Sequence, residues 1–158
     1  RIIIRRNNMG LDQYAGTMRE VSYEYNRPDG EKHIEKWQQA GPFEWRKHAR
    51  LQEFMNTLYM ERNKLRSKWE QSEPDSDGKV WYNPISWNSI ELLEDDIDKL
   101  EEAINNGYCK YFCDGGFYWG HEFQESQAEY YKEKDLEFVE FAREALADGE
   151  TVVYECSW

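Results

Sequence analysis

The chain has 158 residues, a length typical of one domain, and its 20 basic and 32 acidic side chains give a net charge of −12. Aromatic residues make up 16% of the chain, which excludes an acidic disordered protein, and no run of about eighteen apolar residues is present to span a membrane. The acidic balance also argues against direct binding of nucleic acid through a basic surface. We therefore expect a folded domain that does not cross a membrane.

The charge is divided unevenly between the two halves of the sequence. Residues 1–70 hold 14 basic and 10 acidic side chains, whereas residues 71–158 hold 6 basic and 22 acidic ones. Such a polar axis could steer a basic partner, or pair the basic part of one copy with the acidic part of another in a homodimer. The simpler alternative is that the acidic residues only solubilise the helices of the second half.

Three elements are predicted in the first half of the chain. Glu20–Tyr25 alternate at period two, which is typical of a strand, and Asn26–Gly30 then carry Pro and Gly as a turn does. Pro42 is predicted to open a long helix that runs to about Gln71 and includes His48. The apolar stripe of this helix comprises Trp45, Leu51, Phe54, Met55, Leu58, Leu65 and Trp69.

A helix is predicted over Ile90–Ile104, where apolar residues recur at spacings of three and four. Its start lies between Ser89 and Glu94, because Ser89–Leu93 could equally finish a strand. Asn105–Gly107 are typical of the end of a helix.

The remaining elements complete an α+β order. Tyr108–Trp119 contain a hairpin signal, a helix covers about Gln124–Asp148 with Gly149 as its cap, and Thr151–Cys156 form a closing strand. The predicted fold is therefore a single α+β domain in which a small antiparallel sheet packs against two or three helices.

The last helix carries the clearest charge pattern in the sequence. Its acidic residues recur every three or four positions and fall within an arc of about 140°. Such a row could bind a basic partner, or imitate the phosphates of nucleic acid in part, since it places about one charge per 5 Å against one per 1.7 Å in duplex DNA. A solvated helix face is the simpler alternative. The residues with the strongest expectation of binding are Glu129, Glu133, Glu137, Glu140 and Glu144.

Cysteine and histidine offer a weaker candidate site. The odd count of three cysteines, without a secretion signal, favours a reducing compartment. Cys109, Cys113 and His121 could supply three metal ligands, with Cys156 or an acid such as Asp12 as a further group, or a nucleophile and its base. Two buried cysteines on one strand face are the simpler alternative, and no established catalytic or cofactor motif is present, so we expect no cofactor.

Short motifs give a resemblance to a known family. Met9-Gly10-Leu11-Asp12-Gln13-Tyr14 resembles the opening of a family of small, uncharacterised bacteriophage and prophage proteins that begin Met-Gly-Leu-Asp-Met-Tyr, with Gln13 in place of the second Met. Further segments that resemble the family follow in order: Trp45-Arg46-Lys47, Gly116-Phe117-Tyr118-Trp119-Gly120, Asp135-Leu136 and Ser157-Trp158.

The resemblance implies a phage-encoded accessory protein made in the cytoplasm of an infected bacterium. It also implies that residues 1–8 are an N-terminal extension, either native or introduced for expression, ahead of a domain over residues 9–158. No activity is established for the family, so the resemblance implies no catalytic residue.

Together these observations predict an acidic accessory protein that binds and modulates a host protein with a basic surface, without catalysis, and in one version as a partial nucleic-acid mimic that blocks a defence nuclease. The alternative is a small hydrolase or metal-binding protein that uses Cys109, Cys113 and His121.

Overall fold

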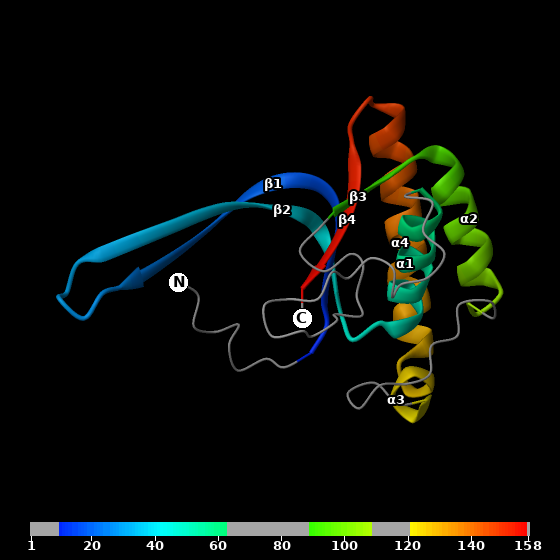
Figure 1. Ribbon diagram of the computed structural model, residues 1–158, viewed down its shortest axis with the longest axis horizontal. Coiled ribbons are helices and arrows are strands. Elements are labelled where there is room, and N and C mark those ends of the chain that lie inside the picture. Colours follow the sequence, from blue (N-terminus) through cyan, green and yellow to red (C-terminus); the bar gives the residue numbers. More distant parts are fainter. Residues whose placement is uncertain (1–9, 63–88, 109–120, 158) are drawn as a thin grey trace.

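A four-stranded antiparallel sheet of order β2-β1-β4-β3, with helices on one side of it, forms the body of the protein (Figure 1). The computed structural model describes residues 10–62, 89–108 and 121–157, with the side chains of 121–123 left out. The predicted α+β class, with an antiparallel sheet packed against helices, is confirmed. The predicted hairpin over Tyr108–Trp119 lies almost entirely outside the described residues.

The first two strands form one long hairpin. β1 (Asp12–Asn26) and β2 (Lys32–Arg46) have 15 residues each and pair along their whole length. The strand predicted at Glu20–Tyr25 and the turn that follows it are confirmed, and in that turn the Gly30 amide donates to the Arg27 carbonyl at 2.9 Å.

The prediction of a helix from Pro42 is wrong. Pro42 lies in β2, opposite Gly16, and α1 begins only at Ala49 and runs to Arg62 in the described residues. β2 has only one strand neighbour in the described sheet, and such an edge strand tolerates the missing N–H of proline. His48 therefore lies between β2 and α1 rather than inside a helix.

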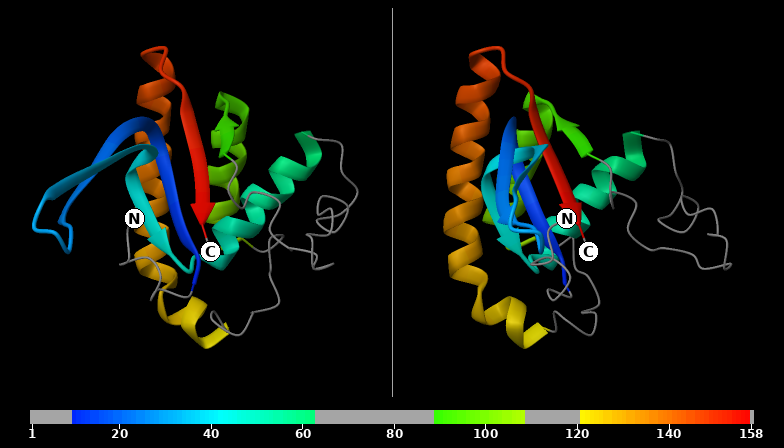
Figure 2. Two further views of the ribbon diagram at one scale, coloured as in Figure 1. Left: turned by 60° about the vertical axis from the view of Figure 1, so that its left-hand side comes forward. Right: turned by 90° about the vertical axis from the view of Figure 1, so that its left-hand side faces the viewer.

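The core lies between the helices and one face of the sheet, and Figure 2 shows α1, α2 and α4 on the same side of the strands. β3 (Ser89–Leu92) and β4 (Val152–Ser157) turn alternate residues to this side, among them Ile90 and Tyr154. The residues of the apolar stripe predicted for the first helix are all buried in the part of the chain that the structure describes. Trp45 joins the core from β2, edge-on to Phe138 with ring centroids 5.6 Å apart.

The helix ends follow local signals in the sequence. α2 (Glu94–Asn105) starts after β3, so Ser89–Leu92 do finish a strand, and the carboxylate of Asp96 accepts the Leu93 amide at 2.7 Å. The single helix predicted over Gln124–Asp148 is instead divided at Gln127 into α3 (His121–Ser126) and α4 (Ala128–Ala147). Gly149 follows α4 with a φ of 78°, the left-handed conformation expected of its predicted cap.

The outer part of the hairpin projects from the body as a two-stranded arm, to the left in Figure 1. β1 pairs with β4 only from Asp12 to Gly16, so Thr17–Asn26 and Lys32–Gly41 pair only with each other among the described strands. Ten residues per strand make this arm roughly 33 Å long. No helix in the described residues is both long and apolar enough to cross a membrane.

Replacing Gly16 with alanine should lower the free energy of unfolding by about 3 kcal/mol. Gly16 has a φ of 134°, and a Cβ atom there would lie 1.9 Å from the carbonyl oxygen of Gly41. Urea unfolding followed by circular dichroism measures the loss. Gly41→Ala is the matched control, because the nearest atom to its added Cβ is Arg19 Cδ at 3.6 Å. Equal losses in the two variants would contradict this account of Gly16.

Candidate functional site

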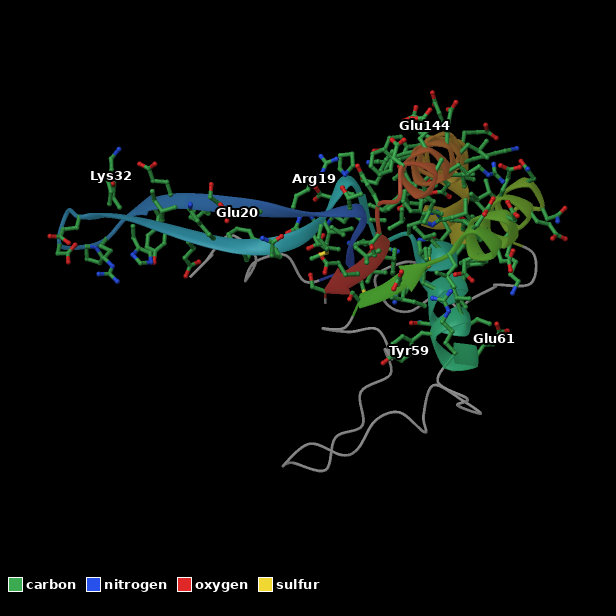
Figure 3. The ribbon with its side chains drawn as sticks, turned by 90° about the horizontal axis from the view of Figure 1, so that it is seen from above. Arg19, Glu20, Lys32, Tyr59, Glu61 and Glu144 are labelled. Carbon is green, nitrogen blue, oxygen red and sulfur yellow. The ribbon has the colours of Figure 1, made fainter. Side chains whose placement is uncertain are left out.

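Five glutamates form a continuous stripe along the exposed side of α4. Glu129, Glu133, Glu137, Glu140 and Glu144 are all exposed. At 100° per residue they lie within an arc of about 80°, over a length of about 22 Å. The structure therefore leaves every carboxylate of the predicted binding set accessible to a partner. Figure 3 shows Glu144 pointing away from the body at one end of this stripe.

Arg143 joins the stripe to the acidic side of α2. Its guanidinium donates to Asp98 at 2.9 Å and to Glu101, so α2 and α4 are held side by side at their exposed surfaces. These two carboxylates raise the pKa of Arg143, chiefly through their hydrogen bonds. We define the acidic surface as the five glutamates of α4 together with Asp98 and Glu101. Together with Arg143, its seven carboxylates give a net charge of −6.

The cysteine and histidine candidates are not brought together by what the structure describes. Cys109 and Cys113 lie outside the described residues, as does the side chain of His121. Cys156 is buried on β4, where its sulfur accepts a hydrogen bond from Gln52 at 3.4 Å. Among the described side chains, no group of three or more His, Cys, Asp or Glu residues is arranged to hold a metal.

A pocket that the sequence analysis did not predict opens where the start of α1, the end of α2 and the first half of α4 meet. Its volume is about 290 Å³, and it is lined by His48, Arg50, Tyr108, Tyr131, Lys132 and Asp135, among others. These residues come from three separate parts of the sequence, which pack together only in the folded chain.

A buried hydrogen-bonded pair, His48 and Asp135, lies at the wall of this pocket. His48 Nε2 is 2.8 Å from Asp135 Oδ2, and both side chains are 1–2% exposed. The Tyr108 hydroxyl donates to the same carboxylate oxygen at 2.7 Å. Tyr131 stacks on the His48 ring with centroids 4.0 Å apart and planes 5° apart. Because a carboxylate accepts, the shared proton belongs to His48 Nε2.

Two atoms of this pair are left without a hydrogen-bond partner in the described part of the chain. They are His48 Nδ1 and Asp135 Oδ1, and both are buried. An unsatisfied buried acceptor costs free energy, so such atoms are typical of a site that a further molecule completes.

Backbone contacts fix the position of His48. The Gln13 side chain donates to the His48 carbonyl at 3.0 Å and accepts the His48 amide at 2.8 Å. Gln124 donates to the Lys47 carbonyl at 2.7 Å and accepts the Ala49 amide at 3.2 Å. Two glutamines from distant elements therefore hold the turn between β2 and α1, and with it the imidazole.

The tyrosines around the pair are held in their neutral form. Burial, together with the negative charge of Asp135, raises the pKa of Tyr108 well above its usual value, against the opposing positive charge of Arg50. Burial and Asp135 also raise the pKa of Tyr131. Both hydroxyls therefore act as hydrogen-bond donors near neutral pH, Tyr108 to Asp135 and Tyr131 to the carbonyl of Arg46 at 2.7 Å.

One signal in the sequence could have pointed to this pocket. Tyr131, Asp135, Phe138 and Ala142 recur at spacings of four, three and four, so an acidic residue occupies the core side of α4. A carboxylate in such a stripe needs a buried partner. The sequence alone did not show that this partner is His48, 87 residues away.

Comparisons of this chain with family models, with curated proteins and with solved structures gave no match.

Proposed function

We propose that this chain is a phage-encoded accessory protein that acts without catalysis and binds a basic surface of a bacterial host protein through its acidic surface. The observation that carries the proposal is the exposure of all five α4 glutamates in one stripe, continuous with Asp98 and Glu101. The phage context rests on the resemblance of Met9–Tyr14 and the four later segments.

The charge distribution supports a role in recognition. α2 and α4 together hold twelve acidic and four basic residues, so these two helices carry −8 of the net charge of −12. Concentrated charge of one sign accelerates encounter with an oppositely charged partner and makes affinity fall as salt rises. Partial mimicry of nucleic acid is one form of this function, in which the partner's basic groove is a DNA-binding groove.

The test is the capture of partners from a bacterial lysate at low and high salt, followed by affinity measurement with the purified partner. The variant is Glu137→Lys, Glu140→Lys and Glu144→Lys, which reverses the stripe at the end away from the pocket. The matched control is Glu20→Lys, Glu31→Lys and Glu61→Lys, which changes the net charge equally at exposed positions of the hairpin and α1. Figure 3 shows Glu20 and Glu61 far from Glu144.

We expect the unmodified protein and the control to retain the same host protein at low salt, and the stripe variant to lose at least about tenfold in affinity, equivalent to about 1.4 kcal/mol. Competition by duplex DNA would identify the partner's groove as a nucleic-acid site. Equal retention by the stripe variant, or no retained protein in any sample, would contradict the proposal.

A further inference from the structure

We infer that the pocket beside His48 and Asp135 binds a small phosphate monoester whose other end carries amino or hydroxyl groups. This inference goes beyond the proposed function, because it concerns a small ligand and a pocket that shares only Glu129 with the acidic surface. It rests on two sets of groups in the pocket. Two buried acceptor atoms lie at its closed end, the floor, and two cations lie at its open end, the mouth.

The floor of the pocket offers hydrogen-bond acceptors, so a ligand bound there must supply donors. In the tautomer with its proton on Nε2, His48 has an acceptor lone pair at Nδ1, and Asp135 Oδ1 is a second acceptor. Both atoms are buried and unsatisfied in the described structure. Amino and hydroxyl groups donate to such acceptors, and burial strengthens these hydrogen bonds.

The two cations at the mouth of the pocket favour an anionic group on the ligand. Arg50 and Lys132 line the pocket, and neither forms an ion pair with any described side chain. The lining also contains two carboxylates, Glu129 and Asp135, and Asp135 is hydrogen-bonded to His48. Arg50 is the second residue of α1, where the helix dipole favours an anion. A phosphate group is a common partner of arginine and lysine at such a position.

The size of the pocket limits the ligand. A volume of about 290 Å³ lies at the lower end of small-molecule sites. It suits one nucleoside monophosphate or sugar monophosphate and is too small for a dinucleotide. These two ligand types share the required chemistry, an anionic end and a donor-rich end.

The experiment is calorimetric titration of the full chain with four kinds of probe: nucleoside monophosphates, sugar monophosphates, the corresponding nucleosides and sugars, and inorganic phosphate. We expect at least one monophosphate to bind at least tenfold more tightly than its unphosphorylated counterpart and than inorganic phosphate. Which monophosphate binds distinguishes a nucleotide from a sugar phosphate. No binding by any monophosphate, or equal binding by inorganic phosphate, would overturn the inference.

Variants at the rim test the location without disturbing the buried pair. Arg50→Ala and Lys132→Ala should each weaken the bound monophosphate at least tenfold, whereas Lys99→Ala removes an exposed cation from α2 and should leave affinity unchanged. Unchanged affinity in both rim variants would place the ligand elsewhere and overturn the assignment. The stripe variant at Glu137, Glu140 and Glu144 should bind the probe normally, so failure of the acidic surface and failure of the pocket are distinguishable.

A spectroscopic readout tests the floor. In protein labelled with nitrogen-15, the Nδ1 resonance of His48, assigned with His33→Gln and His121→Gln variants, should shift as the monophosphate saturates the pocket. The pairing with Asp135 should keep the Nε2 proton in place. Tight binding with no change at Nδ1 would show that the ligand does not reach the buried acceptor.

Discussion

Replacing Asp135 with alanine should lower the free energy of unfolding by about 4 kcal/mol, the largest loss expected from one carboxylate in the described structure. The substitution leaves His48 Nε2 and the Tyr108 hydroxyl buried with no acceptor. Each unsatisfied donor costs about 1–3 kcal/mol, and the stacked rings of His48 and Tyr131 allow little room to relax. Urea unfolding at neutral pH measures the loss.

Two further variants show whether this loss comes from the buried contacts or from the charge. Glu137→Ala removes the same charge from the exposed side of the same helix and should change stability by less than about 0.5 kcal/mol. Asp135→Asn keeps the shape and one acceptor oxygen, so its loss should fall between the other two. If Asp135→Ala and Glu137→Ala unfold at the same urea concentration, the buried pair does not stabilise the fold.

The elements that local sequence signals predict correctly are those whose cause is itself local. The end of α2 at Asn105–Gly107, the cap at Gly149 and the turn at Asn26–Gly30 depend on residues within a few positions. β4 also matches its prediction to within one residue, because three β-branched residues follow a helix end.

The largest error has a non-local cause. Residues 32–46 show no apolar alternation, since Ile34 and Trp37 lie on opposite faces of β2. This segment is extended because the turn brings it against β1, and fifteen residues then pair in register. Pro42 is compatible with both a helix start and an edge strand, so only the pairing decides between them.

The acidic stripe could be predicted from the sequence, and the pocket could not. The exposure of Glu129–Glu144 follows from helical periodicity alone. The pocket instead requires the turn at His48, the end of α2 at Tyr108 and the core side of α4 to meet. Its charged residue Asp135 is visible in the sequence, but its partners depend on the tertiary fold.

Raising the pH above 10 should destabilise the protein steeply, and the cause is three buried tyrosines. Burial raises the pKa of Tyr108, Tyr131 and Tyr154 above their ordinary value of 10.0. Asp135 adds to the effect at Tyr108 and Cys156 at Tyr154, although the hydrogen bond from Gln13 opposes it at Tyr154. In the folded protein all three hydroxyls therefore keep their protons at a pH where the unfolded chain loses them.

The sign of the effect follows from the proton count. Below pH 10 the folded and unfolded states both hold the three protons, so the stability is fully present. Above it the unfolded state binds fewer protons, and the free energy of unfolding falls by about 1.4 kcal/mol per tyrosine per pH unit. Three tyrosines give a loss of about 6 kcal/mol between about pH 9 and about pH 11.5.

Urea unfolding across this pH range measures the slope, and the absorbance of tyrosinate reports ionisation on unfolding. Tyr108→Phe, Tyr131→Phe and Tyr154→Phe should each reduce the slope by about a third, although each also loses hydrogen bonds and starts from a lower stability. Tyr130→Phe is the matched control, because the Tyr130 side chain is 56% exposed on α4. A slope that none of the three buried substitutions reduces would show that other groups cause the alkaline transition. A reduction by about a third in each variant would assign the transition to the three buried tyrosines.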